Sequence, residues 1–382
     1  MIRVVILGQG MVASHFAVGV ERLKTGEIKP FGVPLAKYNL PYKPEDIEIV
    51  AAYDVDADKV GKSIYEVAKK LVGDILPIPE TLKDIEVREG IHLGSLRGLP
   101  FKPRGLDDRM SVHEAIMKLV DEWKSLDVDV VINVITTEPA KPFNELSMLE
   151  YTIHRDKGGL SATQAYAYAV ALYSREHKRA AFVNAIPVPI ANDRAFIELY
   201  EKYGAVVFGD DGATGATPLT ADLLEHMAER NRIVQYVVQF NIGGNTDFLA
   251  LDIPERNVMK ETTKSTIVED ILGYDAPHYI KPTGYLEPIG DKKYVAMHLE
   301  YLTFNNLKDE LYINARINDS PALAGLLVDL ARLGKIAVDR GVKGTVYEVN
   351  AFYMKNPGPY NAKAIAKIVA YYKLLDWLGI SK

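Results

Sequence analysis

One stretch in the second half of the chain combines glycines, amides and cations in a way that suits chemistry on a small polar anion. It reads NIGGNTDFLALDIPERNVMKETTKS, and the polar side chains around its glycine pair are Asn241, Asn245 and Asp247. Lys260 and Lys264 follow four residues apart, so a helix would place both ammonium groups on one face. Amides bind hydroxyls and ammonium groups bind anions, which suits a sugar phosphate. The alternative is a polar loop followed by a solvated helix start.

A glycine-rich turn near the start of the chain has the pattern of a dinucleotide-binding loop. The apolar run RVVIL predicts a buried strand, and G-x-G-x-x-A follows it directly, before a helical pattern. In this motif Gly8 permits the tight turn, Gly10 lets the backbone approach a pyrophosphate, and Ala13 allows close helix packing. The helix N-terminus, at Met11 and Val12, offers N–H groups to the phosphates. Because strand and helix flank the motif correctly, it indicates nucleotide binding.

Polar residues at the ends of later predicted strands are further candidates for cofactor binding. The strand over residues 47–53 ends in Asp54, whose carboxylate would bind the ribose hydroxyls and repel a 2′-phosphate, which favours NAD over NADP. Its distance from the glycines exceeds the usual ~20 residues, and the Pro- and Gly-rich insertion at 25–46 accounts for the difference. The alternative for Asp54 is an N-cap of the next helix. Asn133 and Thr136 end another strand, where doubly wound sheets bind ligands.

A second glycine-rich segment, GDDGATGAT, follows the short apolar strand expected at 205–208. The carboxylate of Asp211 and the hydroxyl of Thr214 could bind a cofactor or substrate hydroxyl there. The competing interpretation is a simple turn before a helix over 218–230.

Composition and cysteine content exclude several classes of protein. The chain has 382 residues, a net charge of −6 and no cysteine. It therefore has no disulfides, thiolate metal sites or cysteine nucleophile, and it is not an aldehyde enzyme that uses a thioester. We see no basic block for nucleic acid and no apolar stretch near the about 18 residues of a membrane span. The N-terminal apolar run is interrupted too early for a signal peptide, so we expect a cytoplasmic enzyme without nucleic-acid or membrane partners.

Alternating strands and helices predict an α/β fold, a Rossmann-type doubly wound parallel sheet. Successive strands late in the chain predict a second α+β domain carrying a mixed or antiparallel sheet. No regular structure is predicted for residues 74–110. We expect three segments: an NAD-binding domain at 1–217, an α+β domain at 218–318, and a C-terminal segment at 319–382.

Several segments together resemble the myo-inositol-1-phosphate synthase (inositol-3-phosphate synthase) family in its shorter prokaryotic form. They are DDGATGAT, NIGGNTD…KETTKS, GDKKYVAM and NDSPALAGLLVDL. The resemblance implies conversion of D-glucose 6-phosphate to 1L-myo-inositol 1-phosphate with tightly bound NAD. The substrate is oxidised at C5, C6 is deprotonated and attacks the C1 aldehyde, and the same NADH reduces the inosose. The resemblance also implies a homotetramer that works in inositol and phospholipid biosynthesis.

The same resemblance implies roles for individual residues. Its catalytic positions correspond to Lys260, Lys264, Lys293, Lys355 and Asp319. Lys260 and Lys355 would stabilise the enolate oxyanion and transfer protons, whereas Lys264 and Lys293 would surround the phosphate and the C1 oxygen. Asp319 would orient a catalytic lysine. The hydroxyl-binding and cofactor-side positions correspond to Asn241, Asn245, Asp247, Asp211 and Thr214.

Departures from the family pattern leave some assignments open. Lys292 stands beside Lys293, so either lysine fits the alignment. Larger relatives carry Lys and Ser-Gly-Gln after the paired aspartates, where this chain has residues 213–216. They carry Asn-Gly-Ser-Pro where this chain reads NAIP at 184–187, which leaves the phosphate contacts open. For each lysine taken singly, the alternative is a solvated surface charge.

The sequence also leaves a divalent metal ion and a different activity open. A metal could polarise the C5 ketone, but there is no H-E-x-x-H motif and the eight histidines are dispersed, so no ligand is assigned. One alternative function is an ordinary NAD-dependent dehydrogenase of two domains, similar to homoserine dehydrogenase, with net release of NADH. The other is a regulatory nucleotide-binding protein without chemistry, against which the four aligned lysines argue.

Overall fold

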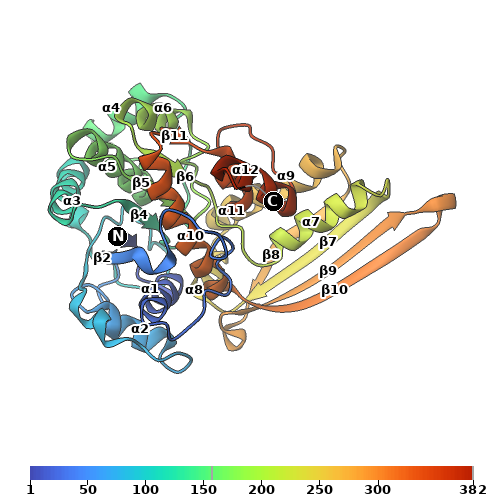
Figure 1. The fold of residues 1–382 in the computed structure, drawn as a ribbon, viewed down its shortest axis with the longest axis horizontal. Helices are drawn as coiled ribbons and strands as arrows, with labels where there is room; N and C mark the ends of the chain where they lie inside the picture. Colours follow the sequence, from blue (N-terminus) through green and yellow to red (C-terminus); the bar gives the residue numbers. More distant parts are fainter. Residues whose placement is uncertain (156–157, 381–382) are drawn as a thin grey trace.

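The computed structural model describes residues 1–155 and 158–380, and within helix α9 it describes the backbone but not the side chains of residues 261–266. The chain forms two sheets that lie side by side (Figure 1). We call the part built on the seven-stranded sheet the large unit. The part from α7 to β10, built around the four-stranded sheet, is the small unit.

The large unit is organised on a parallel sheet with the strand order β11-β6-β5-β4-β1-β2-β3. Its strands are β1 (Ile2–Leu7), β2 (Ile47–Asp54), β3 (Val87–Glu89), β4 (Val130–Asn133), β5 (Ala181–Asn184), β6 (Val206–Phe208) and β11 (Gly344–Thr345). The order 3-2-1-4-5-6 is that of a doubly wound Rossmann sheet, with its switch point between β1 and β4. The predicted fold class is confirmed.

Helices cover both faces of this sheet, which is why its strands are apolar on both sides. The helices are α1 (Met11–Lys24), α2 (Ile64–Val72), α3 (Val112–Leu126), α4 (Leu146–Arg155), α5 (Ala162–Glu176), α6 (Arg194–Tyr203), α10 (Asp319–Asp339), α11 (Tyr347–Tyr353) and α12 (Lys367–Leu378). Along β1, Val4 and Ile6 pack into the core with α1 and α10, whereas Val5 and Leu7 pack into the core with α3 and α5. Successive side chains of β1 thus point to opposite faces of the sheet and pack into two different hydrophobic cores.

The segment between residues 74 and 110 contains more regular structure than the sequence predicted. It includes the edge strand β3 and two 3₁₀ turns, at Glu80–Asp84 and Leu106–Asp108. Three further 3₁₀ turns lie at Pro44–Asp46, Glu287–Ile289 and Phe304–Asn306. A three-residue edge strand is too short to show a hydrophobic period, which explains the difference.

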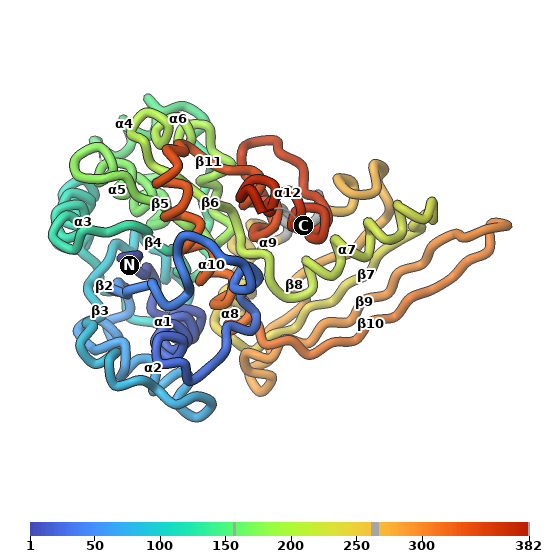
Figure 2. Tube along the Cα trace, in the orientation of Figure 1, coloured from blue at the N-terminus to red at the C-terminus, as the bar shows by residue number. Residues whose placement is uncertain are grey.

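The insertion over residues 25–46 packs on the large unit and does not extend over the surface as a loose loop. The main-chain N–H of Leu35 donates to Asp329 Oδ2 at 2.7 Å, and Arg332 Nε donates to the carbonyl of Tyr42 at 2.8 Å. Asp329 and Arg332 lie on α10 and form a buried ion pair. Figure 2 shows α10 crossing from the base of β10 back into the large unit, beside this insertion.

The small unit has a mixed four-stranded sheet with the order β10-β9-β7-β8. Its strands are β7 (Ile233–Gly243), β8 (His278–Tyr285), β9 (Lys292–Leu302) and β10 (Lys308–Asn318), and its helices are α7 (Thr217–Ala228), α8 (Thr246–Ala250) and α9 (Pro254–Leu272). β7 pairs with β8 in parallel and with β9 in antiparallel, and β9 pairs with β10 in antiparallel. Helices α7 and α9 pack on one face of this sheet, and β9 and β10 extend away from the large unit (Figure 1). The predicted second sheet is confirmed.

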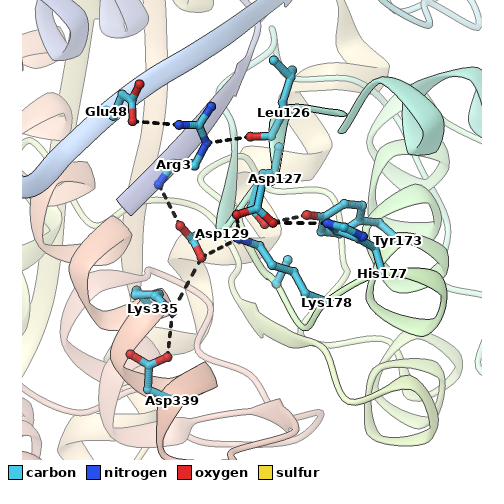
Figure 3. A network of polar contacts seen from close by, with 12 residues as sticks. Arg3, Glu48, Leu126, Asp127, Asp129, Tyr173, His177, Lys178, Lys335 and Asp339 are labelled. Carbon is cyan, nitrogen blue, oxygen red and sulfur yellow. Dashed lines mark hydrogen bonds and ion pairs between the residues drawn. The ribbon is translucent and has the colours of Figure 1, made fainter. Parts of the chain in front are cut away.

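A polar network joins the amino ends of β1 and β4 to the end of α10 (Figure 3). Asp129 Oδ2 accepts a hydrogen bond from the main-chain N–H of Arg3 at 2.9 Å. Its other oxygen lies 3.6 Å from Lys335 Nζ, which also pairs with Asp339 at 2.7 Å. This network holds the C-terminal end of α10 at the amino ends of β1 and β4. The N-terminal end of the same helix, at Asp319, lies at the cavity.

Candidate active site

A cavity lies at the carboxyl ends of the large unit's strands, where it meets the small unit. Its wall from the large unit includes Gly8, Gly10, Met11, Val12, Asp54, Lys59, Thr136, Asp211, Thr214, Asp319 and Lys355. Its wall from the small unit includes Asn245, Asp247, Phe248, Lys260 and Lys293. Doubly wound sheets bind ligands at this edge, near the switch point. Most of the residues that the sequence indicated therefore share one cavity.

The glycine loop has the shape that a pyrophosphate requires. Gly8 has φ +90°, and a Cβ atom there would lie 2.7 Å from the Cα of Ile135. A side chain is therefore excluded both by conformation and by space. At Gly10, the N-cap of α1, a Cβ would meet nothing within 4 Å, so the loop is open on that side. Ala13 is buried in the core and is not among the lining residues, as expected for a packing position.

Asp54 is the acceptor that shapes this loop. Its Oδ2 accepts from the main-chain N–H of Gln9 at 2.8 Å and from Lys59 Nζ at 3.0 Å, and its Oδ1 accepts from the N–H groups of Val55 and Asp56. The N-cap of α2 is Ser63, so the alternative interpretation of Asp54 as that cap is wrong. Lys59 lies in the cavity wall beside Asp54, and nothing in the sequence pattern distinguished it from a surface lysine.

Two of the predicted polar residues do not line the cavity. Asn133 is buried, and its Nδ2 donates to Thr163 Oγ1 at 3.2 Å and to Asn184 Oδ1 at 3.0 Å. Asn241 lies within β7, where its Nδ2 donates to the carbonyl of Lys281 at 2.9 Å. Asn133 joins β4 to β5, and Asn241 joins β7 to β8. The sequence of one strand does not show which groups the neighbouring strand will present to it. Thr136, three residues after Asn133, does line the cavity.

Three buried lysines meet carboxylates in this cavity. Lys260 Nζ on α9 and Lys355 Nζ after α11 lie 3.0 Å and 3.1 Å from the same oxygen, Asp211 Oδ1. Lys293 Nζ on β9 lies 2.7 Å from Asp319 Oδ1 at the start of α10. All three lysines are less than a tenth exposed, so a solvated surface charge does not describe them. The fourth predicted lysine, Lys264, has a side chain outside those that the structure describes, and its role stays a prediction.

The alternation of β9 distinguishes the two adjacent lysines. Lys293 points into the cavity and is buried, whereas Lys292 is exposed. Gly215, with φ +69°, passes so close that a Cβ there would lie 2.5 Å from Lys293 Nζ. The GATGAT segment therefore leaves the space in which this ammonium group lies.

The cluster gives its two central lysines opposite pKa shifts. Burial lowers the pKa of Lys355, and the nearby charges of Lys260 and Lys293 lower it further despite Asp211. Burial also opposes the charge on Lys260, but Asp211 and Asp247 outweigh it and raise its pKa above the ordinary value. Burial would raise the pKa of Asp211, yet the two ammonium groups hold it well below its usual range. Lys260 is thus held as a cation, whereas the ammonium form of Lys355 is disfavoured relative to that of an exposed lysine.

Asp291 organises the junction that carries Asp319 and Asn245. Its carboxylate accepts from the main-chain N–H of Ser320 at 2.9 Å, from Ser320 Oγ at 2.6 Å and from Asn245 Nδ2 at 3.0 Å. Asn245 Oδ1 in turn accepts from the N–H of Phe248 as the N-cap of α8. Asp291 thereby fixes the start of α10, next to the Lys293–Asp319 pair.

No metal centre emerges from the part of the chain that is described. Within residues 1–155 and 158–380, no group of three or more His, Cys, Asp or Glu side chains is arranged to hold an ion. The described residues thus offer no such set of three side chains for the divalent ion that the sequence left open. No helix among them has the length and apolar character to cross a membrane.

The fold and the cavity define the class of protein. It is a Rossmann-type protein whose small unit adds buried lysines to a cavity at the carboxyl ends of the strands of a doubly wound sheet. The family described as Myo-inositol-1-phosphate synthase matches residues 215–320. A crystal structure of a myo-inositol-1-phosphate synthase-related protein from Thermotoga maritima is 58% identical to this chain, with a TM-score of 0.94. That similarity covers 100% of this chain and 99% of that one. The chain belongs to the myo-inositol-1-phosphate synthase family, a family of enzymes.

A more distant relative agrees with this assignment, and a more distant solved structure shares the fold. An inositol-3-phosphate synthase from Mycolicibacterium smegmatis is 28% identical over 384 residues, which is 96% of each chain. The crystal structure of inositol-3-phosphate synthase from Caenorhabditis elegans shares the fold, with a TM-score of 0.82 at 16% identity, and the match covers 98% of this chain and 84% of that one.

Proposed function

We propose that this chain converts D-glucose 6-phosphate to 1L-myo-inositol 1-phosphate in a cycle that starts and ends with NAD. The observation that carries the proposal is the meeting of three buried lysines with the glycine loop in one cavity. Bound NAD would supply a hydride acceptor at C5 and the hydride donor for the final reduction. Three buried ammonium groups suit an enolate-forming cyclase, which must stabilise an oxyanion, better than a dehydrogenase whose hydride transfer forms no enolate.

The residues that would bind NAD follow from the cavity wall. The N–H groups at the start of α1 would bind the pyrophosphate, since an N-terminus favours anions. Asp54 and Lys59 would lie at the adenosine ribose. Thr136, which follows β4 at the same carboxyl-end side of the sheet, would lie towards the nicotinamide. We assign residues 1–217 to this NAD-binding domain, residues 218–318 to the catalytic and oligomerisation domain, and residues 319–382 to the returning segment.

The lysines would divide the chemistry according to their charges. Lys260, held as a cation between Asp211 and Asp247, would stabilise the oxyanion at C5 when C6 is deprotonated. Lys355, with its lowered pKa, would move the proton. Lys293 with Asp319 would bind the C1 oxygen or the phosphate. Apolar Phe248 in the wall would limit water near these charges and so strengthen each interaction.

A turnover assay separates this function from that of a dehydrogenase. Purified protein is incubated with glucose 6-phosphate and NAD while inositol phosphate and absorbance of free NADH are followed together. We expect inositol phosphate to accumulate with no net NADH. Steady NADH release without a cyclised product would establish the dehydrogenase instead.

Substitution of Asp54 tests the proposed choice of cofactor. Asp54→Asn should weaken NAD binding by about tenfold and relax the rejection of NADP, because it removes the charge that faces the ribose and supports Gln9. Equilibrium titration with both cofactors measures the two effects. Asp58→Asn, at an exposed site four residues on, is the control. Unchanged preference in Asp54→Asn would show that the carboxylate only shapes the loop.

The Asp211 cluster predicts a specific response to acid. Since its folded pKa is depressed, the stability from Asp211 is present above the ordinary aspartate pKa of about 4 and is lost as pH falls further. Asp211→Asn should reduce the slope of unfolding free energy against pH below that value by up to about 1.4 kcal/mol per pH unit. Denaturant unfolding at a series of pH values measures the slope, and identical slopes in both proteins would contradict the prediction.

We also propose that the protein is a homotetramer joined through the uncovered face of the small sheet. Phe240, Tyr279 and Tyr312 are exposed on its strands, and exposed apolar patches of this kind mark interfaces. Light scattering after size-exclusion chromatography should give four copies for the wild type and fewer for Phe240→Glu. A monomeric wild type would refute the assembly.

A further inference from the structure

A buried arginine on α9 joins the small unit to two loops of the cofactor cavity. Arg256 is 2% exposed. Its Nη2 donates to the main-chain carbonyls of Ser95 at 2.7 Å and Arg97 at 2.9 Å, and its Nη1 donates to the carbonyl of Thr137. One guanidinium thus binds three carbonyls from two separate segments of the large unit.

Both segments form part of the wall of the cavity. Ser95, with Leu96 beside it, lines the cavity from the loop after β3, and Thr136 lines it from the loop after β4. The second loop has another link to the small unit, because Thr137 Oγ1 donates to Asp247 Oδ1 at 2.9 Å. A ligand that contacts these loops therefore acts on segments that Arg256 binds directly.

The contacts of Arg256 are unusual for a buried cation. All three acceptors are neutral carbonyls, while the carboxylates of Glu138 and Asp247 act on it through space. Burial lowers the pKa of this guanidinium, which reflects an unfavourable environment for its charge. A methionine of similar size would avoid that cost, so stability alone does not explain an arginine here.

Arg256 lies one helical turn before Lys260 on α9, where residues four apart share a face. Fixing Arg256 to the two loops fixes the position of the Lys260 ammonium relative to Asp211 in the large unit. We propose that Arg256 is a positioning residue that couples occupancy of the cofactor cavity to the placement of Lys260 through the carbonyls of residues 95, 97 and 137. The inference rests on the proposed function in one respect, that NAD occupies this cavity.

Hydrogen exchange with and without NAD tests this coupling without turnover. In the wild type, NAD should slow exchange in a peptide covering residues 251–260 by about tenfold, because the loops that Arg256 binds become more ordered. In Arg256→Met, NAD should still bind, since the glycine loop and Asp54 are intact, but the slowing should shrink to less than about twofold. Arg256→Lys, which keeps the charge with fewer donors, should give an intermediate value. Glu255→Gln is the control, because Glu255 is exposed and directly precedes Arg256. NAD should slow exchange in this variant as much as in the wild type.

The outcomes separate this inference from the proposed function. If NAD binds but slows exchange equally in the wild type and Arg256→Met, the coupling is refuted and the cofactor site stands. The coupling is likewise refuted if NAD binds the wild type without slowing exchange there. If NAD does not bind the wild type, the proposed function fails first. Should Arg256→Met not fold, Arg256→Lys decides: an NAD effect equal to that of the wild type would refute the coupling.

Discussion

Replacing Lys260 by methionine should lower kcat for glucose 6-phosphate by about 10³-fold while leaving the Kd for NAD within about threefold. Lys260 carries the charge that would face the developing oxyanion, and its two carboxylate partners hold it protonated. The glycine loop and Asp54, which would bind most of the cofactor, belong to the large unit and are held by their own hydrogen bonds. Product formation measures the first effect, and equilibrium titration measures the second.

A charge-retaining variant sharpens this test. Lys260→Arg should recover part of the lost rate, because the guanidinium keeps a positive charge opposite Asp211. A large loss of NAD affinity in Lys260→Met would place this lysine in the cofactor site. A kcat of Lys260→Met within about tenfold of the wild-type value would show that Lys260 does not take part in the chemical step.

The adjacent lysines of β9 provide a matched pair for the second large effect. Lys293→Met should lower kcat/KM for glucose 6-phosphate by about 10²-fold, since a buried ammonium group beside Asp319 is lost from the cavity. Lys292→Met, one residue away and exposed, should change kcat/KM by less than about twofold. Steady-state kinetics with both variants measures the contrast.

The same pair shows what would contradict the assignment. Equal losses of kcat/KM in both variants would indicate a general effect of charge on the strand. A loss of kcat/KM confined to Lys292→Met would show that Lys292, and not Lys293, is the residue that acts in the cavity. The Lys293→Met protein should also release Asp319 from its ion pair, so thermal unfolding of both variants is needed to separate stability from catalysis.

The sequence predicted the sheet and its ligand-binding edge because these depend on local patterns. Apolar runs indicated the strands, and the spacing of Gly8, Gly10 and Ala13 placed a tight turn between strand and helix. The choice between Lys292 and Lys293 could not be made from the sequence, because a shift of one residue along a strand reverses the face of every side chain. The pairing of β9 with β7 and β10 determines that face.

Other features depend on contacts between distant segments and have no local pattern. Asn133 and Asn241 have the residue type and strand position of ligand-binding groups, but each instead bonds to a neighbouring segment of the protein. Arg256 binds main-chain carbonyls, which every residue possesses, so its acceptors cannot be recognised in the sequence. Lys59 differs from a surface lysine only through the position of Asp54 after folding.

The cyclisation proposal is tested most directly by following the hydrogen at C5 of the substrate. Glucose 6-phosphate carrying deuterium at C5 is converted by the wild-type protein in the presence of excess unlabelled NAD and NADH, and the inositol phosphate is analysed by mass spectrometry and NMR. If one tightly bound cofactor takes the hydride and returns it, the product should retain the deuterium at the carbon derived from C5. Inositol phosphate without deuterium, or deuterium that accumulates in free NADH, would contradict the proposed cycle.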